Sequence, residues 1–145
     1  FLAETRVVHL RMGLVLGQGG GVIPILKWPF LCFVGGHLGH GKQGFPWIHI
    51  EDVVGIIMHC IENTSISGPV NVVAPENPSL AMFCRFLGKV WKRPSWLHVP
   101  AFIIQFFLGD MAITLLNTPF VKTVRLLDYV FKVPSIGDFY LDSKN

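Results

Sequence analysis

Charged side chains are scarce in this chain of 145 residues, since only 14% of them are charged while 51% are hydrophobic. Soluble domains usually carry about 25% charged residues. The chain therefore has too little polar surface to cover a core on every side, and we expect part of its apolar surface to pack against another segment. The net charge of +3 is spread without a dense basic run, which argues against a nucleic-acid partner.

Cysteine is also rare, and the three residues Cys32, Cys60 and Cys84 are widely spaced between apolar neighbours. This pattern predicts buried free thiols rather than disulfides, and it is typical of an intracellular compartment, either cytoplasmic or mitochondrial. The histidines match no standard zinc spacing, so no metal site is predicted.

An uninterrupted hydrophobic run of spanning length is missing. The best candidate, Trp96 to Leu116, is broken by His98, Pro100, Gln105 and Asp110, whereas a bilayer needs roughly 20 mainly apolar residues. We expect an amphipathic helix packed on a core, without stable membrane insertion; a helix lying on a membrane surface is a weaker hypothesis, because few Lys or Arg would meet lipid. The chain begins at Phe1 and enters a strand almost at once, which is typical of a fragment.

The hydrophobic pattern along the chain alternates between strands and helices. Buried strands are predicted at 6–16, 45–50 and 69–74, an extended segment at 96–99, and helices at 22–33, 51–63, 79–91, 101–116 and 121–129, before an irregular end from 138. Pro29 is expected to end or kink its helix, and Ser79 to cap another. This order predicts an α/β fold whose parallel sheet continues beyond the chain.

Glycine gathers in two segments, Gly17 to Gly21 and Gly35 to Gly44. The first lies between a strand and a helix, but Val22 stands where a dinucleotide-binding G-x-G-x-x-G/A loop needs a small residue. We interpret it as a flexible connection. The second is predicted to be a loop that approaches a ligand closely or adopts positive φ. It does not resemble a phosphate-binding loop, because no Gly-Lys-Ser/Thr follows.

The proton-transfer set of dehydrogenases, a Ser or Thr with Tyr and Lys four residues apart, is absent except for a chance match of Tyr140 with Lys144. No catalytic residue is predicted, and the chain alone is expected to be inactive. His49 and Asp52 stand at a strand end and a helix start, where α/β proteins bind ligands. We expect them to act mainly as a structural pair, with Asp52 capping the backbone N–H groups of its helix.

The runs Arg11 to Gly21, Gly35 to Asp52 and Gly68 to Pro75, followed by Arg93-Pro94 and Leu108-Gly109-Asp110, resemble the epimerase-like short-chain dehydrogenases/reductases of family 39U. The similarity covers nearly the whole chain. It implies the C-terminal part of an extended Rossmann-type fold: residues 1–86 complete the NAD(P)-binding domain, and residues 87–145 form a small, mostly helical, substrate-side domain. The sequence departs from the family pattern at Asn117 to Phe120 and from Asp138 onward, so the resemblance does not support the last predicted helix, 121–129.

The resemblance also implies a function. The full-length protein would be an NADP(H)-dependent epimerase or oxidoreductase of unknown small-molecule substrate, with its phosphate-binding glycines and catalytic groups upstream of this chain. The nicotinamide would lie against Gly13, Leu14 and above all Val15, and the substrate-side candidates are Gln43, Trp47, His49 and Asp52. The alternative is a truncated, non-catalytic binding or scaffold protein with the same fold.

Overall fold

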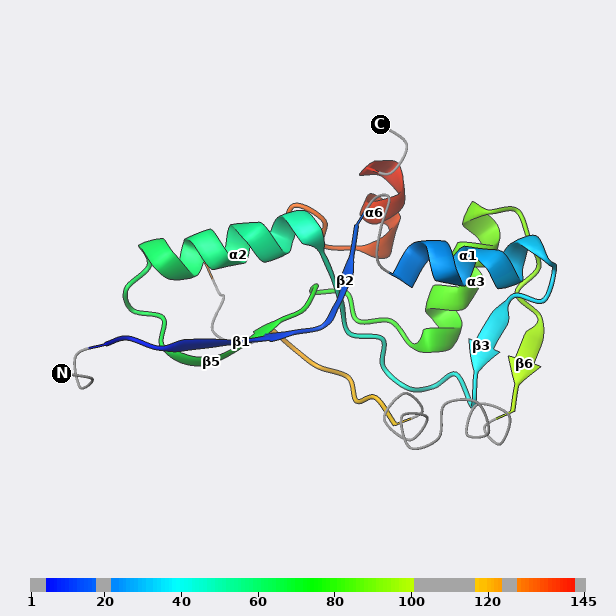
Figure 1. Cartoon of the computed structure of the whole chain (residues 1–145), viewed down its shortest axis with the longest axis horizontal. Helices are drawn as coiled ribbons and strands as arrows, with labels where there is room; N and C mark the ends of the chain where they lie inside the picture. Colours follow the sequence, from blue (N-terminus) through cyan, green and yellow to red (C-terminus); the bar gives the residue numbers. More distant parts are fainter. Residues whose placement is uncertain (1–4, 18–21, 101–116, 124–127, 143–145) are drawn as a thin grey trace.

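The computed structural model describes residues 5–17, 22–100, 117–123 and 128–142, and within them strands and helices alternate (Figure 1). The three strand pairs, β1–β5, β2–β4 and β3–β6, are all parallel. The predicted α/β class is therefore confirmed. The elements in chain order are β1 (Val8–Met12), β2 (Leu14–Leu16), α1 (Val22–Leu31), β3 (Gly36–Leu38), β4 (Trp47–His49), α2 (Ile50–Glu62), β5 (Gly68–Val72), α3 (Leu80–Val90), β6 (Leu97–Val99) and α6 (Ile136–Asp142).

The predicted first strand is in fact two strands, because the chain changes partners at Gly13. The Gly13 N–H donates to Val72 O of β5 at 3.0 Å, whereas the next N–H, of Leu14, donates to Pro46 O at 2.8 Å, just before β4. A Cβ at position 13 would lie 2.7 Å from that same Pro46 oxygen. Only glycine allows the chain to pass between the two partner strands at this point.

The second glycine segment contains a strand where the sequence predicted only a loop. β3 pairs with β6, about 60 residues later in the chain, and a Cβ at Gly36 would lie 1.6 Å from Leu97 O. Such a distant partner is invisible to local periodicity. The expected positive φ is confirmed at Gly39 and Gly41, with φ of 59° and 68°.

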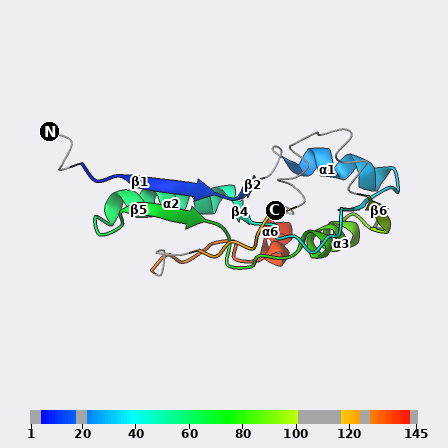
Figure 2. The ribbon, with the colours of Figure 1, turned by 90° about the horizontal axis from the view of Figure 1, so that it is seen from below.

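The helices follow their predicted positions closely in the first hundred residues. α1 continues for two residues past Pro29, and α3 begins after Ser79, whose Oγ accepts the N–H of Met82 at 3.3 Å as predicted. In Figure 1, α2 lies along the β1–β5 pair, while α1, α3, β3 and β6 gather at the other end of the molecule; Figure 2 shows the same separation from below.

Two predictions for the C-terminal part are wrong. Residues 121–123 and 128–129 are not helical, and the carbonyls of Val121 and Lys122 accept hydrogen bonds from the side chains of Asn77 and Asn71. In contrast, α6 occupies a segment predicted to be irregular. Ser135 and Asp138 stabilise its first turn, because the Ser135 Oγ accepts the Asp138 N–H and donates to its carboxylate. The predicted helix at 101–116 lies outside the described residues.

All three cysteines are free, but only two are buried. Cys60 and Cys84 lie in the core, and burial raises the pKa of the Cys84 thiol to about 12. Cys32 is exposed just after α1, contrary to the prediction, because it follows the last turn of that helix rather than facing the core. Among the described residues, no helix is long and apolar enough to cross a membrane, and no group of three side chains suits a metal ion.

Candidate cofactor and substrate site

The two sets of predicted site residues meet at one edge of the β2–β4 pair. The strands are parallel and in register, so that Leu14 lies opposite Trp47 and Leu16 opposite His49. Ligands of open α/β sheets bind beyond the carboxyl ends of the strands; Leu16 and His49 stand at that end here, whereas Leu14 and Trp47 begin their strands. The residues predicted to lie along the nicotinamide are therefore neighbours of two residues predicted on the substrate side.

β2 offers one exposed and one enclosed side chain at this edge. Leu14 is 39% exposed. Val15 is half-buried and packs against the cluster of Ile48 and its neighbours. Successive side chains of a strand point to opposite faces. Of the three residues predicted along the cofactor, Leu14 thus presents the most apolar surface, Val15 supports it from the other face, and Gly13 provides backbone only.

Trp47 and His49 are fixed from the opposite side by α6. Both are almost completely buried. The Trp47 Nε1–H donates to Glu76 O at 2.9 Å, and the Phe139 ring meets both aromatic side chains edge-on, with centroid distances of 6.3 Å to Trp47 and 5.6 Å to His49. α6, whose existence the sequence did not predict, is therefore part of the wall behind β4.

Asp52 holds a segment 80 residues away. One carboxylate oxygen accepts the N–H of Lys132 at 2.7 Å and the hydroxyl of Tyr129 at 3.1 Å, and the other accepts the N–H of Val133 at 3.0 Å. Burial, the hydrogen bond from the Tyr129 hydroxyl to Asp52 and the charge of Asp52 together raise the pKa of Tyr129 to about 12. Asp52 was expected to cap α2, and this prediction is wrong. The N-cap residue of α2 is His49, whose side chain forms no cap bond, and the Asp52 carboxylate accepts the N–H groups of Lys132 and Val133 instead.

Gln43, far from α3 in the sequence, lies beside the first residue of that helix in the fold. Its side chain is buried, and its backbone oxygen accepts the N–H of Leu80 at 3.0 Å, next to the bridge between Gly44 and Ser79. Four of the predicted site residues thus stand at junctions between elements, where they join β4, α2, α3 and the C-terminal segment.

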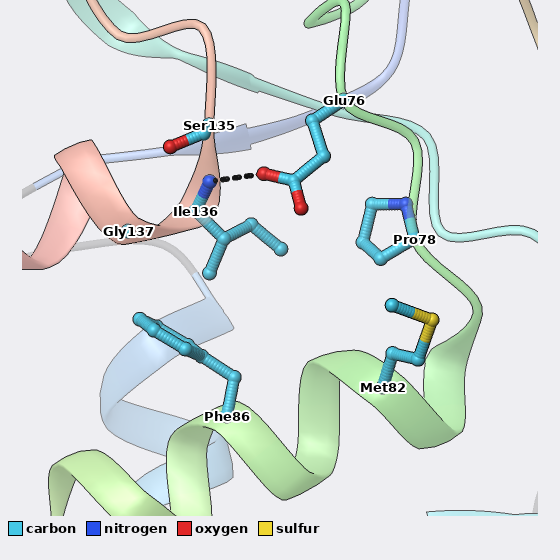
Figure 3. Close-up of a pocket in the computed structure, with 7 residues that line it drawn as sticks. All are labelled: Glu76, Pro78, Met82, Phe86, Ser135, Ile136 and Gly137. Atoms are coloured by element: carbon cyan, nitrogen blue, oxygen red, sulfur yellow. Dashed lines mark hydrogen bonds between the residues drawn. The ribbon is translucent and has the colours of Figure 1, made fainter.

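A pocket of about 440 Å³ opens beside this junction (Figure 3). Met82 and Phe86 of α3 face Ile136 and Pro78 across it, and the Glu76 carboxylate accepts the N–H of Ile136 at 2.8 Å. Its size and apolar walls suit a small organic ligand. The lining residues are Glu76, Pro78, Met82, Phe86, Ser135, Ile136 and Gly137. Sequence reasoning missed them because Ile136 and Gly137 belong to α6, which was not predicted; the available signal was the Ser135-x-x-Asp138 capping pattern.

Comparison with known proteins yields no match to an established family profile. Individual relatives do match. The chain is 39% identical over 137 residues to the chloroplastic homologue of epimerase family protein SDR39U1 from Arabidopsis thaliana, and 38% identical over 137 residues to human SDR39U1, with 93% and 92% of this chain covered. A crystal structure of human SDR39U1 with NADPH superposes with a TM-score of 0.88 at 36% identity over 97% of this chain.

The chain is similar in sequence and in fold to the SDR39U1 epimerase family proteins. The fold is that of the Rossmann-like epimerases and short-chain dehydrogenases/reductases. The chain spans 40% of the Arabidopsis relative and 47% of the human one, and 49% of the human crystal structure. The similarity therefore concerns about half the length of these relatives. One relative is named chloroplastic, and the compartment of this chain stays a prediction.

Proposed function

We propose that this chain forms the nicotinamide wall and the substrate-side half of an NADP(H)-dependent epimerase or oxidoreductase acting on a small molecule. The observation that carries the proposal is the close similarity in fold to a relative crystallised with NADPH. In this proposal, residues 1–86 complete the cofactor domain and residues 87–145 form the substrate-side domain. The cofactor's phosphates and the catalytic groups belong to the other half of such a protein.

The proposed nicotinamide wall is the start of β2. A flat, uncharged ring needs an apolar surface together with backbone groups, which the exposed Leu14 and the closely packed Gly13 supply. Val15 holds this wall in place through its contact with the cluster behind it. The wall therefore orients the ring but does not bind the phosphates.

The substrate-side residues act mainly by position. Trp47, His49 and Asp52 are almost fully buried, and Trp47 and Asp52 hydrogen-bond to protein groups. We assign them the task of fixing the β4–α2 junction against α6. The pocket between Met82 and Ile136 then takes the apolar part of the substrate. Met82→Trp, which fills this pocket, is expected to abolish the thermal stabilisation given by any small molecule that binds there.

NADPH titration of the complete gene product that contains this chain tests the function. Leu14→Asp is expected to weaken NADPH binding at least tenfold, because a carboxylate set against an apolar ring costs several kcal/mol unless it is paired. Met12→Asp is the matched control, since Met12 is exposed on β1 but precedes the proposed wall. The isolated 145-residue chain is expected to bind NADPH only weakly.

Two outcomes overturn the proposal. Unchanged affinity in a folded Leu14→Asp protein removes β2 from the cofactor site, and tight NADPH binding by the isolated chain contradicts the assignment of the phosphate site to the other half. A complete gene product that folds but binds neither NADPH nor NADH favours the non-catalytic scaffold instead.

A further inference from the structure

A second hollow, of about 520 Å³, lies at the C-terminal end of α3 and the turn that follows it. It shares no residue with the pocket of Figure 3, which lies along the first half of the same helix. Among the described residues that line it, four side chains are cations and none is a carboxylate; these residues are Arg85, Gly88, Lys89, Lys92, Arg93 and Ser95. This is a strong local concentration of positive charge for a chain with a net charge of only +3.

The helix dipole explains only part of this charge. Cations near the C-terminal end of a helix are favourable, which accounts for Lys89 in the last turn of α3. Lys92 lies beyond the helix and adopts φ of 53°, the left-handed conformation in which helices usually place glycine. A lysine there retains backbone strain that glycine would avoid. The position thus keeps a charged side chain at a cost in stability.

Two buried polar atoms of the hollow lack a hydrogen-bond partner. They are Arg93 Nε and Ser95 Oγ, for which the described part of the chain provides no partner, and buried polar groups are nearly always paired. The Arg93 Cζ lies 4.6 Å from the centroid of the Phe33 ring, a cation–π contact that positions the guanidinium but gives its Nε–H no acceptor. Within residues 5–17, 22–100, 117–123 and 128–142, no carboxylate forms an ion pair with any of the four cations.

We propose that this hollow binds the phosphate group of a small molecule. Its cations, a fixed guanidinium and a hydroxyl are the groups that recognise a phosphate dianion, and Arg donates to phosphate in a bidentate manner. A ligand that carries a single carboxylate would neutralise only one of the four positive charges. The hollow is larger than a phosphate ion and leaves room for an organic part. The inference is independent of the proposed cofactor wall on β2.

Calorimetric titration of the 145-residue chain with inorganic phosphate at low ionic strength tests the site. Wild type is expected to bind saturably with one site. Lys92→Gly is the decisive variant: it is expected to weaken phosphate binding about tenfold, because one charge-assisted contact is lost, and yet to raise the thermal midpoint, because glycine relieves the left-handed strain. Lys122→Ala is the control, since it removes the same charge from an exposed position elsewhere.

Each remaining outcome counts against the site. Absence of saturable phosphate binding, an equal loss of affinity in Lys122→Ala, or acetate binding as tight as phosphate overturns the proposal. Sedimentation with vesicles that contain phosphatidic acid distinguishes the phosphate group of a lipid from that of a small molecule. Binding to those vesicles without affinity for free phosphate also overturns the small-molecule assignment.

Discussion

The two hydrophobic clusters of this chain differ in how many segments enclose them. The larger cluster draws on β2, α1, β4, α3 and α6, and buries residues such as Phe83 and Phe139 from several directions. The smaller cluster lies between α2 and the β1–β5 pair, with Ile56 and Val70 at its centre. β4 joins the two, because Trp47 enters the larger cluster and Ile48, on the opposite face, the smaller one.

The outer surface of α2 shows what the smaller cluster lacks. Val53, Ile56 and Cys60 face inward, but a second apolar stripe at three- and four-residue spacing is exposed; it consists of Ile50, Val54, Ile57, Met58 and Ile61. A helix that is apolar on two sides normally has neighbours on both, and parallel strands are normally covered on both faces. The smaller cluster is thus a single layer whose covering helix is apolar on its outer side as well, whereas the larger cluster is enclosed by five elements.

The largest expected effect separates the two clusters. Phe83→Ala is expected to lower the free energy of unfolding by about 3–5 kcal/mol, as for other buried aromatic residues, and to raise amide hydrogen exchange throughout the chain. Ile56→Ala, with about 2–4 kcal/mol, is expected to raise exchange mainly in α2, β1 and β5. Uniform exchange in both variants would mean that the two clusters unfold as one.

The next largest effect concerns the clamp between the clusters, Asp52. Asp52→Ala leaves the buried N–H of Val133 and the partly buried N–H of Lys132 without an acceptor, and we expect about 2–4 kcal/mol of lost stability. Asp52→Asn is expected to lose at least half as much, because its amide keeps only one acceptor oxygen for two N–H groups. Thermal unfolding measures both. A stable Asp52→Asn protein would show that one of the two contacts contributes little.

Local patterns in the sequence determined most elements of this fold but few of its long-range contacts. The stripe of α3, the Ser79 cap and the β-branched run of β5 are local, and they were predicted within a few residues. The break at Gly13, the pairing of β3 with β6 and the Asp52 clamp depend on partners 30 to 80 residues away in the chain. The candidate pocket was missed for the same reason, since its wall includes the start of α6, which lies about 50 residues after α3 in the chain.

A smaller effect on stability, but a clear one on association, is expected from the exposed stripe of α2. Ile57→Lys with Ile61→Lys is expected to change the free energy of unfolding by less than about 1 kcal/mol, because surface substitutions usually change it by about 0.5 kcal/mol or less. Self-association of the isolated chain should fall, which sedimentation velocity measures. Thr64→Lys adds charge at an exposed polar residue as the control. If it reduces association equally, the charge matters and the stripe does not.

The most local effect is the pH dependence of the contact between Tyr129 and Asp52. The pKa of Tyr129 is raised to about 12 by burial, by its hydrogen bond to Asp52 and by the charge of that carboxylate. In the unfolded chain, the pKa of a tyrosine is about 10. The folded state therefore favours the protonated hydroxyl. Its contribution to stability is complete below about pH 10 and is lost as the pH rises from about 10 to about 12.

Tyr129→Phe is expected to be less stable than wild type near neutral pH by about 0.5–1.5 kcal/mol, and to lose less stability across this alkaline range. Urea unfolding at several pH values measures both curves, and the absorbance of tyrosinate, from only two tyrosines, reports the titration directly. Parallel curves for wild type and Tyr129→Phe would show that the hydroxyl titrates normally and that the clamp depends on the two backbone N–H groups alone.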